Sequence, residues 1–89
     1  MPDVPSAADT LGWAYYHQGV YNSAIGTLQE AVNGNPQNPT FHYHLGMAYD
    51  KANNPAMARK QFESALKISP NYPQAAEMKR LLEQSSQTN

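Results

Sequence analysis

Residues 11–15 read Leu-Gly-Trp-Ala-Tyr, and residues 45–49 read Leu-Gly-Met-Ala-Tyr. The two stretches are 34 residues apart, and that offset recurs elsewhere in the chain. It relates Ala24, Ala31 and Pro36 to Ala58, Ala65 and Pro70, and Leu28 to Phe62. A fixed period of this length predicts stacked units, each of which needs a neighbour to bury its apolar face. Such chains present surfaces to partners, and we expect no enzymatic activity.

The spacing of apolar residues and of helix-ending residues predicts helices and no strands. The expected helices cover residues 5–17, 21–33, 39–52, 55–68 and 73–84. Gly19 follows the first helix and Asn53 stands at the same place in the second unit; both residue types tolerate a positive φ. Asn54 is a good N-cap and Pro55 a good first helical residue. The agreement between the two units supports the register.

The fifth expected helix departs from the repeat because it is polar where the earlier units are not. Lys79, Arg80 and Glu83 occupy the positions of Leu45, Gly46 and Tyr49. We expect those earlier residues to meet a following helix, so a polar face here indicates a terminal cap. Residues 1–4 are expected to be disordered and residues 85–89 to form a frayed polar tail.

These residues resemble the tetratricopeptide repeat family, whose pattern has Leu-Gly-x2-Tyr, then Ala-x3-Phe, then Ala and Pro. The family's leading Trp is absent, and Ala8 and His42 stand in its place. The resemblance implies an all-α fold, a right-handed α-solenoid of antiparallel helix pairs. Residues 5–38 and 39–72 would be two full repeats, with 73–84 as the capping helix. The repeats are also similar to those of bacterial envelope and export proteins, so we expect a fragment of a larger bacterial protein.

The resemblance further implies a concave groove, lined by the first helix of each pair, that binds a peptide or helix of a partner. Carried onto this sequence, the groove residues are Asp9, Trp13, Tyr16, His17, Thr40, Tyr43, His44, Met47, Asp50, Lys51, Gln74 and Glu77. Trp, Tyr and Met are side chains that partner sites favour. In the alternative interpretation, Trp13 and Met47 pack between helices, and Tyr16 and Tyr43 are ordinary surface aromatics. The basic clamp that some family members use for a terminal carboxylate is missing.

Charge excludes a general attraction to nucleic acid or to anionic membranes, because the net charge is −1. The charges are unevenly placed: residues 1–50 carry four carboxylates and no Lys or Arg, whereas residues 51–89 carry six basic residues and three carboxylates. The split is either a chance distribution of surface charge or a source of weak head-to-tail attraction between copies or neighbouring repeats.

The sequence contains no recognisable motif for catalysis, metal binding or cofactor binding. The chain has no cysteine, and His42 and His44 would point apart on a helix, so no metal site is expected. No Gly-rich phosphate loop or catalytic constellation is present, and we expect no cofactor. No apolar run is long enough to insert into a membrane, and the N-terminus lacks signal-peptide character. We expect a soluble chain, from a cytoplasmic or periplasmic parent.

Two repeats with a cap at only one end leave the outer face of the first helix uncovered. About three repeats are normally needed for stability. We therefore expect a homodimer or a helix-swapped oligomer. The alternative function is a structural, self-associating scaffold segment, whose main contacts are with neighbouring repeats or with another copy.

Overall fold

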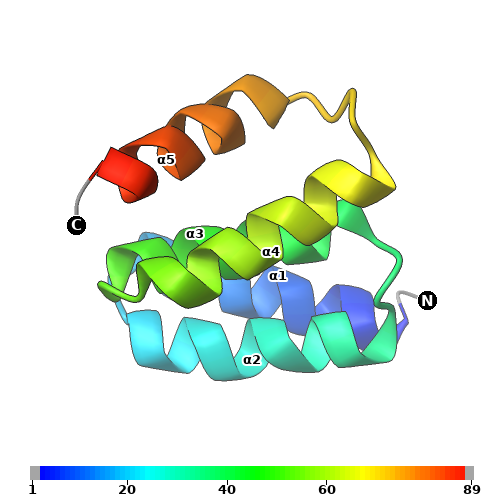
Figure 1. Ribbon diagram of the computed structural model, residues 1–89. Coiled ribbons are helices and arrows are strands. Elements are labelled where there is room, and N and C mark those ends of the chain that lie inside the picture. The colour runs from blue at the N-terminus through cyan, green and yellow to red at the C-terminus, as the bar shows by residue number, and fades with distance from the viewer. Residues whose placement is uncertain (1–2, 88–89) are drawn as a thin grey trace.

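The computed structural model describes residues 3–87, which form helices and contain no strand. The helices are α1 (Val4–His17), α2 (Tyr21–Gly34), α3 (Pro39–Lys51), α4 (Pro55–Ile68) and α5 (Ala75–Gln87) (Figure 1). The all-α prediction is confirmed. The first four helices lie within one residue of their expected bounds. The expected bounds 73–84 for the last helix are wrong, since the helix begins two residues later and ends three residues later.

The first and last helices differ from their expected bounds for local reasons. Asp3 accepts a hydrogen bond from the backbone N–H of Ser6 at 2.8 Å, so α1 begins at Val4, within the segment expected to be disordered. Before α5, backbone hydrogen bonds from Tyr72 N to Ser69 O and from Ala75 N to Tyr72 O hold a turn that delays the helix. Residues 85–87, expected in the frayed tail, are helical, and the rest of that tail lies outside the described residues.

Helix ends follow the signals in the sequence. Asn38 caps α3 through the N–H of Thr40 at 2.9 Å, and Asn54 caps α4 through the N–H of Met57 at 3.3 Å. Gly19 and Asn53 adopt φ values of 79° and 62°. A left-handed residue at this point reverses the chain after the first helix of each pair. The two hairpins therefore have matching turns.

Two glycines let the helices within each hairpin approach closely. A Cβ atom built on Gly12 would lie 2.5 Å from Leu28 Cγ, and one on Gly46 would lie 2.5 Å from Phe62 Cε1. Leu28 and Phe62 are fully buried, so neither can move aside without disturbing the core. The small residues at matched positions thus set the separation of α1 from α2 and of α3 from α4.

Two connected cores hold the hairpins together. The first joins α2 to α3 and contains Ala24, Leu28, Ala31, Val32, Phe41, Leu45 and Ala48. The second joins α3, α4 and α5 and contains Tyr43, Ala58, Phe62, Ala65 and Met78. The expectation that Leu45 meets a following helix is wrong, because Leu45 packs back onto the preceding hairpin. Gly46, one residue on, does face the following helix.

α5 covers the last hairpin with a polar outer side, as the sequence predicts for a cap. Met78 is completely buried, with Leu81 and Leu82 packed beside it. Lys79 and Arg80 are exposed. Strict repeat register would place Lys79 where Leu45 lies in the second unit. α5 instead buries Met78, the residue before Lys79, so this helix is rotated relative to the strict repeat register.

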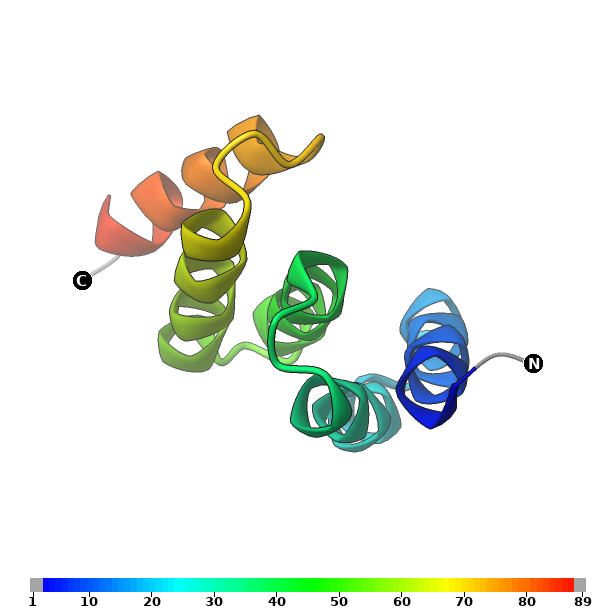
Figure 2. The ribbon, with the colours of Figure 1, turned by 90° about the vertical axis from the view of Figure 1, so that its right-hand side faces the viewer.

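The helices follow a curved path when seen nearly end-on (Figure 2). α1, α3 and the start of α5 lie on one side of this path, and α2 and α4 lie on the other. The first helix of each hairpin therefore contributes to the same side of the molecule. Side chains from α1, α3 and α5 can meet there.

Candidate partner-binding surface

Five rings from α1, α3 and the α4–α5 connection form a connected cluster, here called the aromatic face: Trp13, Tyr16, Tyr43, His44 and Tyr72. Trp13 stacks on Tyr16 with ring centroids 4.4 Å apart, and on His44 with centroids 3.8 Å apart. Tyr43 lies 6.2 Å from Trp13 and 5.7 Å from Tyr72, centroid to centroid. The cluster therefore runs without a break from the first hairpin to the loop before the cap.

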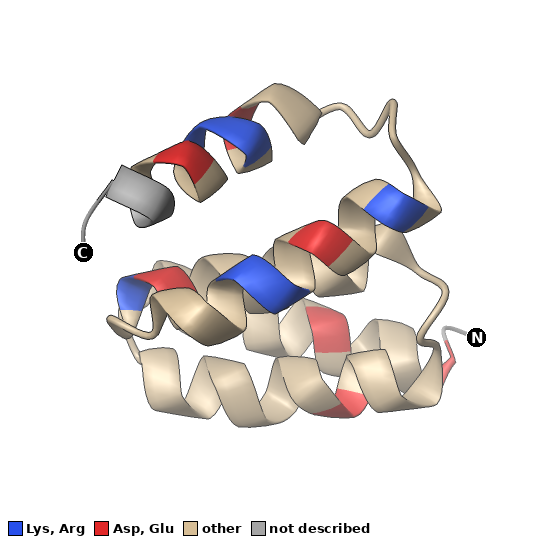
Figure 3. Ribbon diagram, viewed as in Figure 1, with Lys and Arg blue, Asp and Glu red and all other residues tan. Residues whose placement is uncertain are grey.

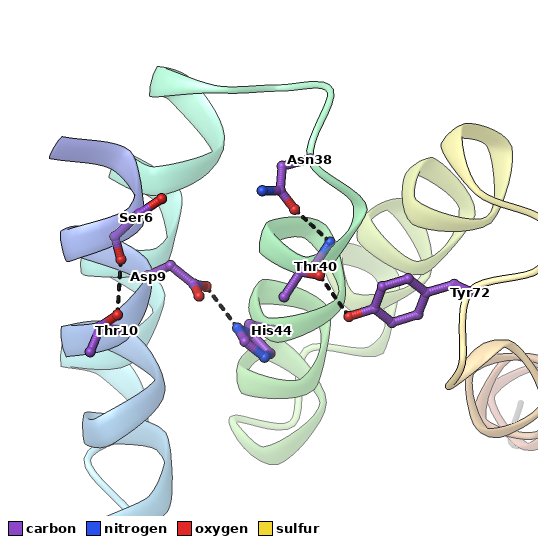
Figure 4. Close-up of polar contacts among 7 residues, drawn as sticks. All are labelled: Ser6, Asp9, Thr10, Asn38, Thr40, His44 and Tyr72. Carbon is purple, nitrogen blue, oxygen red and sulfur yellow. Dashed lines mark hydrogen bonds and ion pairs between the residues drawn. The ribbon is translucent and has the colours of Figure 1, made fainter. Parts of the chain in front are cut away.

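A side-chain hydrogen bond joins α1 to α3 at this face. His44 Nδ1 lies 2.7 Å from Asp9 Oδ1 (Figure 4), and both side chains are largely buried, with 12% and 14% exposed. Because a carboxylate only accepts, the Nδ1 atom must carry a proton and donate it. The bond fixes the orientation of the His44 ring against Trp13.

Two tyrosine hydroxyls tie the later elements to α3. Tyr72 donates to Thr40 Oγ1 at 2.8 Å (Figure 4), and Tyr43 donates to Glu77 Oε1 at 3.0 Å. The first bond holds the α4–α5 connection, and the second holds the first turn of α5. Tyr72 was missed in the sequence because the repeat pattern concerns helices and this residue lies in a connection. Its position between Pro70 and Pro73 was the only signal available.

The environment of the face disfavours ionised tyrosine. Burial raises the pKa of Tyr16, and the nearby Tyr21 hydroxyl and the Asp50 and Glu77 carboxylates raise this pKa further. Burial likewise raises the pKa of Tyr43 well above its usual range, helped by the hydrogen bond to Glu77. Both hydroxyls are therefore neutral hydrogen-bonding groups at physiological pH.

Most of the predicted groove residues meet at the aromatic face. His17 lies edge-on to Trp13, with ring centroids 4.8 Å apart, and Asp50 acts electrostatically on Tyr16. Lys51 and Gln74 are exposed near helix ends. Partner binding by any of these residues remains a prediction.

The alternative interpretation of the aromatic residues is correct for some of them. Trp13 packs between α1 and α3 through His44 and Tyr43, and Met47 packs against the second core. Tyr43 is not an ordinary surface aromatic, because only 8% of it is exposed. Tyr16 is half-buried, and its ring is the outer member of the stack on α1.

A shallow pocket elsewhere shares no residue with the aromatic face. It measures about 390 Å³ and is lined by Pro36, Gln37, His42, Ser64, Lys67 and Ile68. Both ring nitrogens of His42 are engaged, with Nε2 2.8 Å from the Pro36 carbonyl oxygen and Nδ1 2.8 Å from the Gln61 side-chain amide. His42 is buried and held on both sides, so its role is structural.

Within residues 3–87, no three His, Cys, Asp or Glu side chains are grouped closely enough to hold a metal ion. No helix in that range has the length and apolar character needed to cross a membrane.

Two family models match the chain. One described as TPR repeat matches residues 12–53, and one described as tetratricopeptide repeat matches residues 39–72. The chain belongs to the tetratricopeptide repeat family. Comparison with curated proteins finds no match. Tetratricopeptide repeats are in general modules for protein–protein interaction or scaffolding and are typically non-catalytic.

Proposed function

We propose that the aromatic face binds an extended or helical segment of a partner protein. The observation that carries this proposal is the unbroken ring cluster from Trp13 to Tyr72 on the side formed by α1, α3 and α5. Aromatic side chains supply large contact areas with few rotatable bonds, which is why they dominate binding energy at protein interfaces. The predicted groove residues Asp9, Asp50 and Glu77 border this cluster.

The face is held in place before any partner arrives. The hydrogen bond between Asp9 and His44 fixes one end of the cluster, and the hydrogen bond between Thr40 and Tyr72 fixes the other. Side chains that are already ordered lose little conformational entropy when a ligand binds. A pre-organised surface of this kind favours a linear segment that adapts to it.

Tyr16→Ala tests this function, because the ring is half-buried and packs against the first core without being one of its buried members. A display library of short random peptides would provide ligands, with affinities measured by fluorescence anisotropy. We expect Tyr16→Ala to weaken selected peptides by about tenfold, the effect of losing one binding hot spot.

Lys67→Ala is the control, since Lys67 is exposed and lines the separate pocket. It should leave the affinities unchanged. Binding that survives Tyr16→Ala but is lost in Lys67→Ala would assign the ligand to the pocket and contradict the proposal.

A second candidate function is self-association through the outer face of α1. Leu11 is 49% exposed, whereas its repeat counterpart Leu45 is fully buried. Ala7 and Ala14 are also exposed on α1, and their counterparts Phe41 and Ala48 are buried. A homodimer, a helix-swapped oligomer or a neighbouring repeat would each bury this apolar strip.

A further inference from the structure

The aromatic face is bordered by carboxylates from three helices. Asp9 comes from α1, Asp50 from α3 and Glu77 from α5. α1 contains no Lys or Arg, and α3 contains only Lys51, its exposed last residue. Each lining helix therefore brings a negative group to the same side of the molecule.

Two of these carboxylates are near Tyr16, and one of them is held at the aromatic face by a hydrogen bond. Asp50 and Glu77 both act electrostatically on its hydroxyl, adding to the effects of burial and of Tyr21 on its pKa. Glu77 uses Oε1 to accept the Tyr43 hydroxyl at 3.0 Å. A carboxylate has two oxygens and accepts several hydrogen bonds, so Glu77 retains the capacity to accept from a ligand.

Of the six Lys and Arg residues, three lie on α4 and three on the lining helices α3 and α5. Arg59, Lys60 and Lys67 are on α4, and Lys79 and Arg80 are on α5 (Figure 3). Lys60, Lys67, Lys79 and Arg80 are exposed. Although the net charge of the chain is only −1, the charged residues are unevenly distributed. α1 and α3 place carboxylates beside the rings, and α4 carries three basic residues.

Taking the proposed function as its premise, we infer that the bound segment is cationic, with Lys or Arg side chains lying over Tyr16 and between Asp50 and Glu77. A Lys or Arg head group is attracted both to the face of an aromatic ring and to a carboxylate. An acidic segment would meet like charge from Asp50 and Glu77, and Lys51 at the end of α3 is the one Lys or Arg among the predicted groove residues. The same carboxylates therefore select for one class of peptide and against the other.

Three matched peptide sets test this inference. They share the same apolar positions and carry Lys, Gln or Glu at all polar positions. Their affinities for the unchanged protein are measured by fluorescence anisotropy at low and high salt. We expect the Lys set to bind most tightly and to weaken as salt increases, because salt screens exposed charges.

Charge-neutral variants locate the effect. The double variant Asp50→Asn, Glu77→Gln keeps both side-chain shapes and an acceptor for Tyr43, and we expect it to weaken the Lys set by about tenfold. Glu63→Gln is the matched control, since Glu63 is an exposed carboxylate on α4. It should leave binding unchanged. Circular dichroism and urea unfolding check that every variant is folded.

The possible failures have distinct meanings. If the Gln or Glu set binds as tightly as the Lys set and depends on Tyr16, the aromatic face binds peptides but the charge inference is overturned. If no set binds, the proposed function fails and the inference fails with it. If the double variant instead changes the oligomeric state of the protein in the absence of peptide, the aromatic face is occupied by the basic half of a second copy, and the inference is overturned.

Discussion

Gly46 is the single residue on which the packing of the second hairpin depends most directly. A methyl group there would lie 2.5 Å from Phe62 Cε1, and Phe62 is only 2% exposed. We expect Gly46→Ala to lower the free energy of unfolding by about 1–3 kcal/mol, because the helices must separate or the ring must leave its rotamer. Urea unfolding followed by circular dichroism measures this.

Gly26 provides the opposite control on α2. A Cβ atom there meets nothing within 4 Å. Gly26→Ala should raise the free energy of unfolding by about 0.5–1 kcal/mol, through the greater helix propensity of alanine. Equal shifts of the same sign in both variants would contradict the packing described for Gly46.

Residues that the repeat constrains were predictable, and residues that depend on one particular neighbour were not. Gly12 and Gly46 recur at the repeat period, so their role in close helix contact could be inferred. The bond from Tyr72 to Thr40 could not, because it joins a connection to a helix far away in the sequence. The pairing of Asp9 with His44 occurs once, since the repeat counterpart of Asp9 is Tyr43 and that of His44 is Thr10.

At the scale of elements, α5 is the helix whose position the repeat least determines. Sequence spacing predicts its existence and its polar outer side, but not its rotation or its bounds. The turn from Ser69 to Ala75 delays its start, and Met78 rather than Lys79 then faces α4. Rotation of a terminal helix is decided by side-chain fit, which a period of 34 residues does not encode.

The stability of α5 should therefore depend on Met78, which is completely buried against the second core. Met78→Ala removes this contact and should destabilise the packing of α5 by about 2–5 kcal/mol. In a stacked repeat each unit contacts only its neighbours. We therefore expect hydrogen exchange to accelerate most in α5 and α4, and least in α1 and α2.

Arg80→Ala is the control on the same helix, because Arg80 is exposed. It should leave exchange rates nearly unchanged. Equal acceleration in all helices of Met78→Ala would show instead that the chain opens as one cooperative unit.

At the scale of the whole molecule, the two ends of the stack differ. α5 covers one end with a polar surface, whereas α1 leaves Leu11 half exposed at the other, and Val4 at 82%. Burial of this strip between two copies would remove apolar surface from water without any change in the fold. We therefore expect dimers at high protein concentration, and we expect Leu11→Gln to shift the equilibrium toward monomer in sedimentation equilibrium experiments.

Val20→Gln is the matched control, since Val20 is 44% exposed but lies in the turn between α1 and α2. It should not change the equilibrium, and a strict monomer of the unchanged protein at high concentration would contradict the proposal.

The salt dependence of dimerisation distinguishes two kinds of dimer. An apolar interface through α1 is insensitive to salt or strengthened by it. A head-to-tail dimer, formed between the acidic first half and the basic second half of the chain, weakens as salt screens its charges. Persistence of the dimer at high salt, together with its loss in Leu11→Gln, would therefore place the interface on α1.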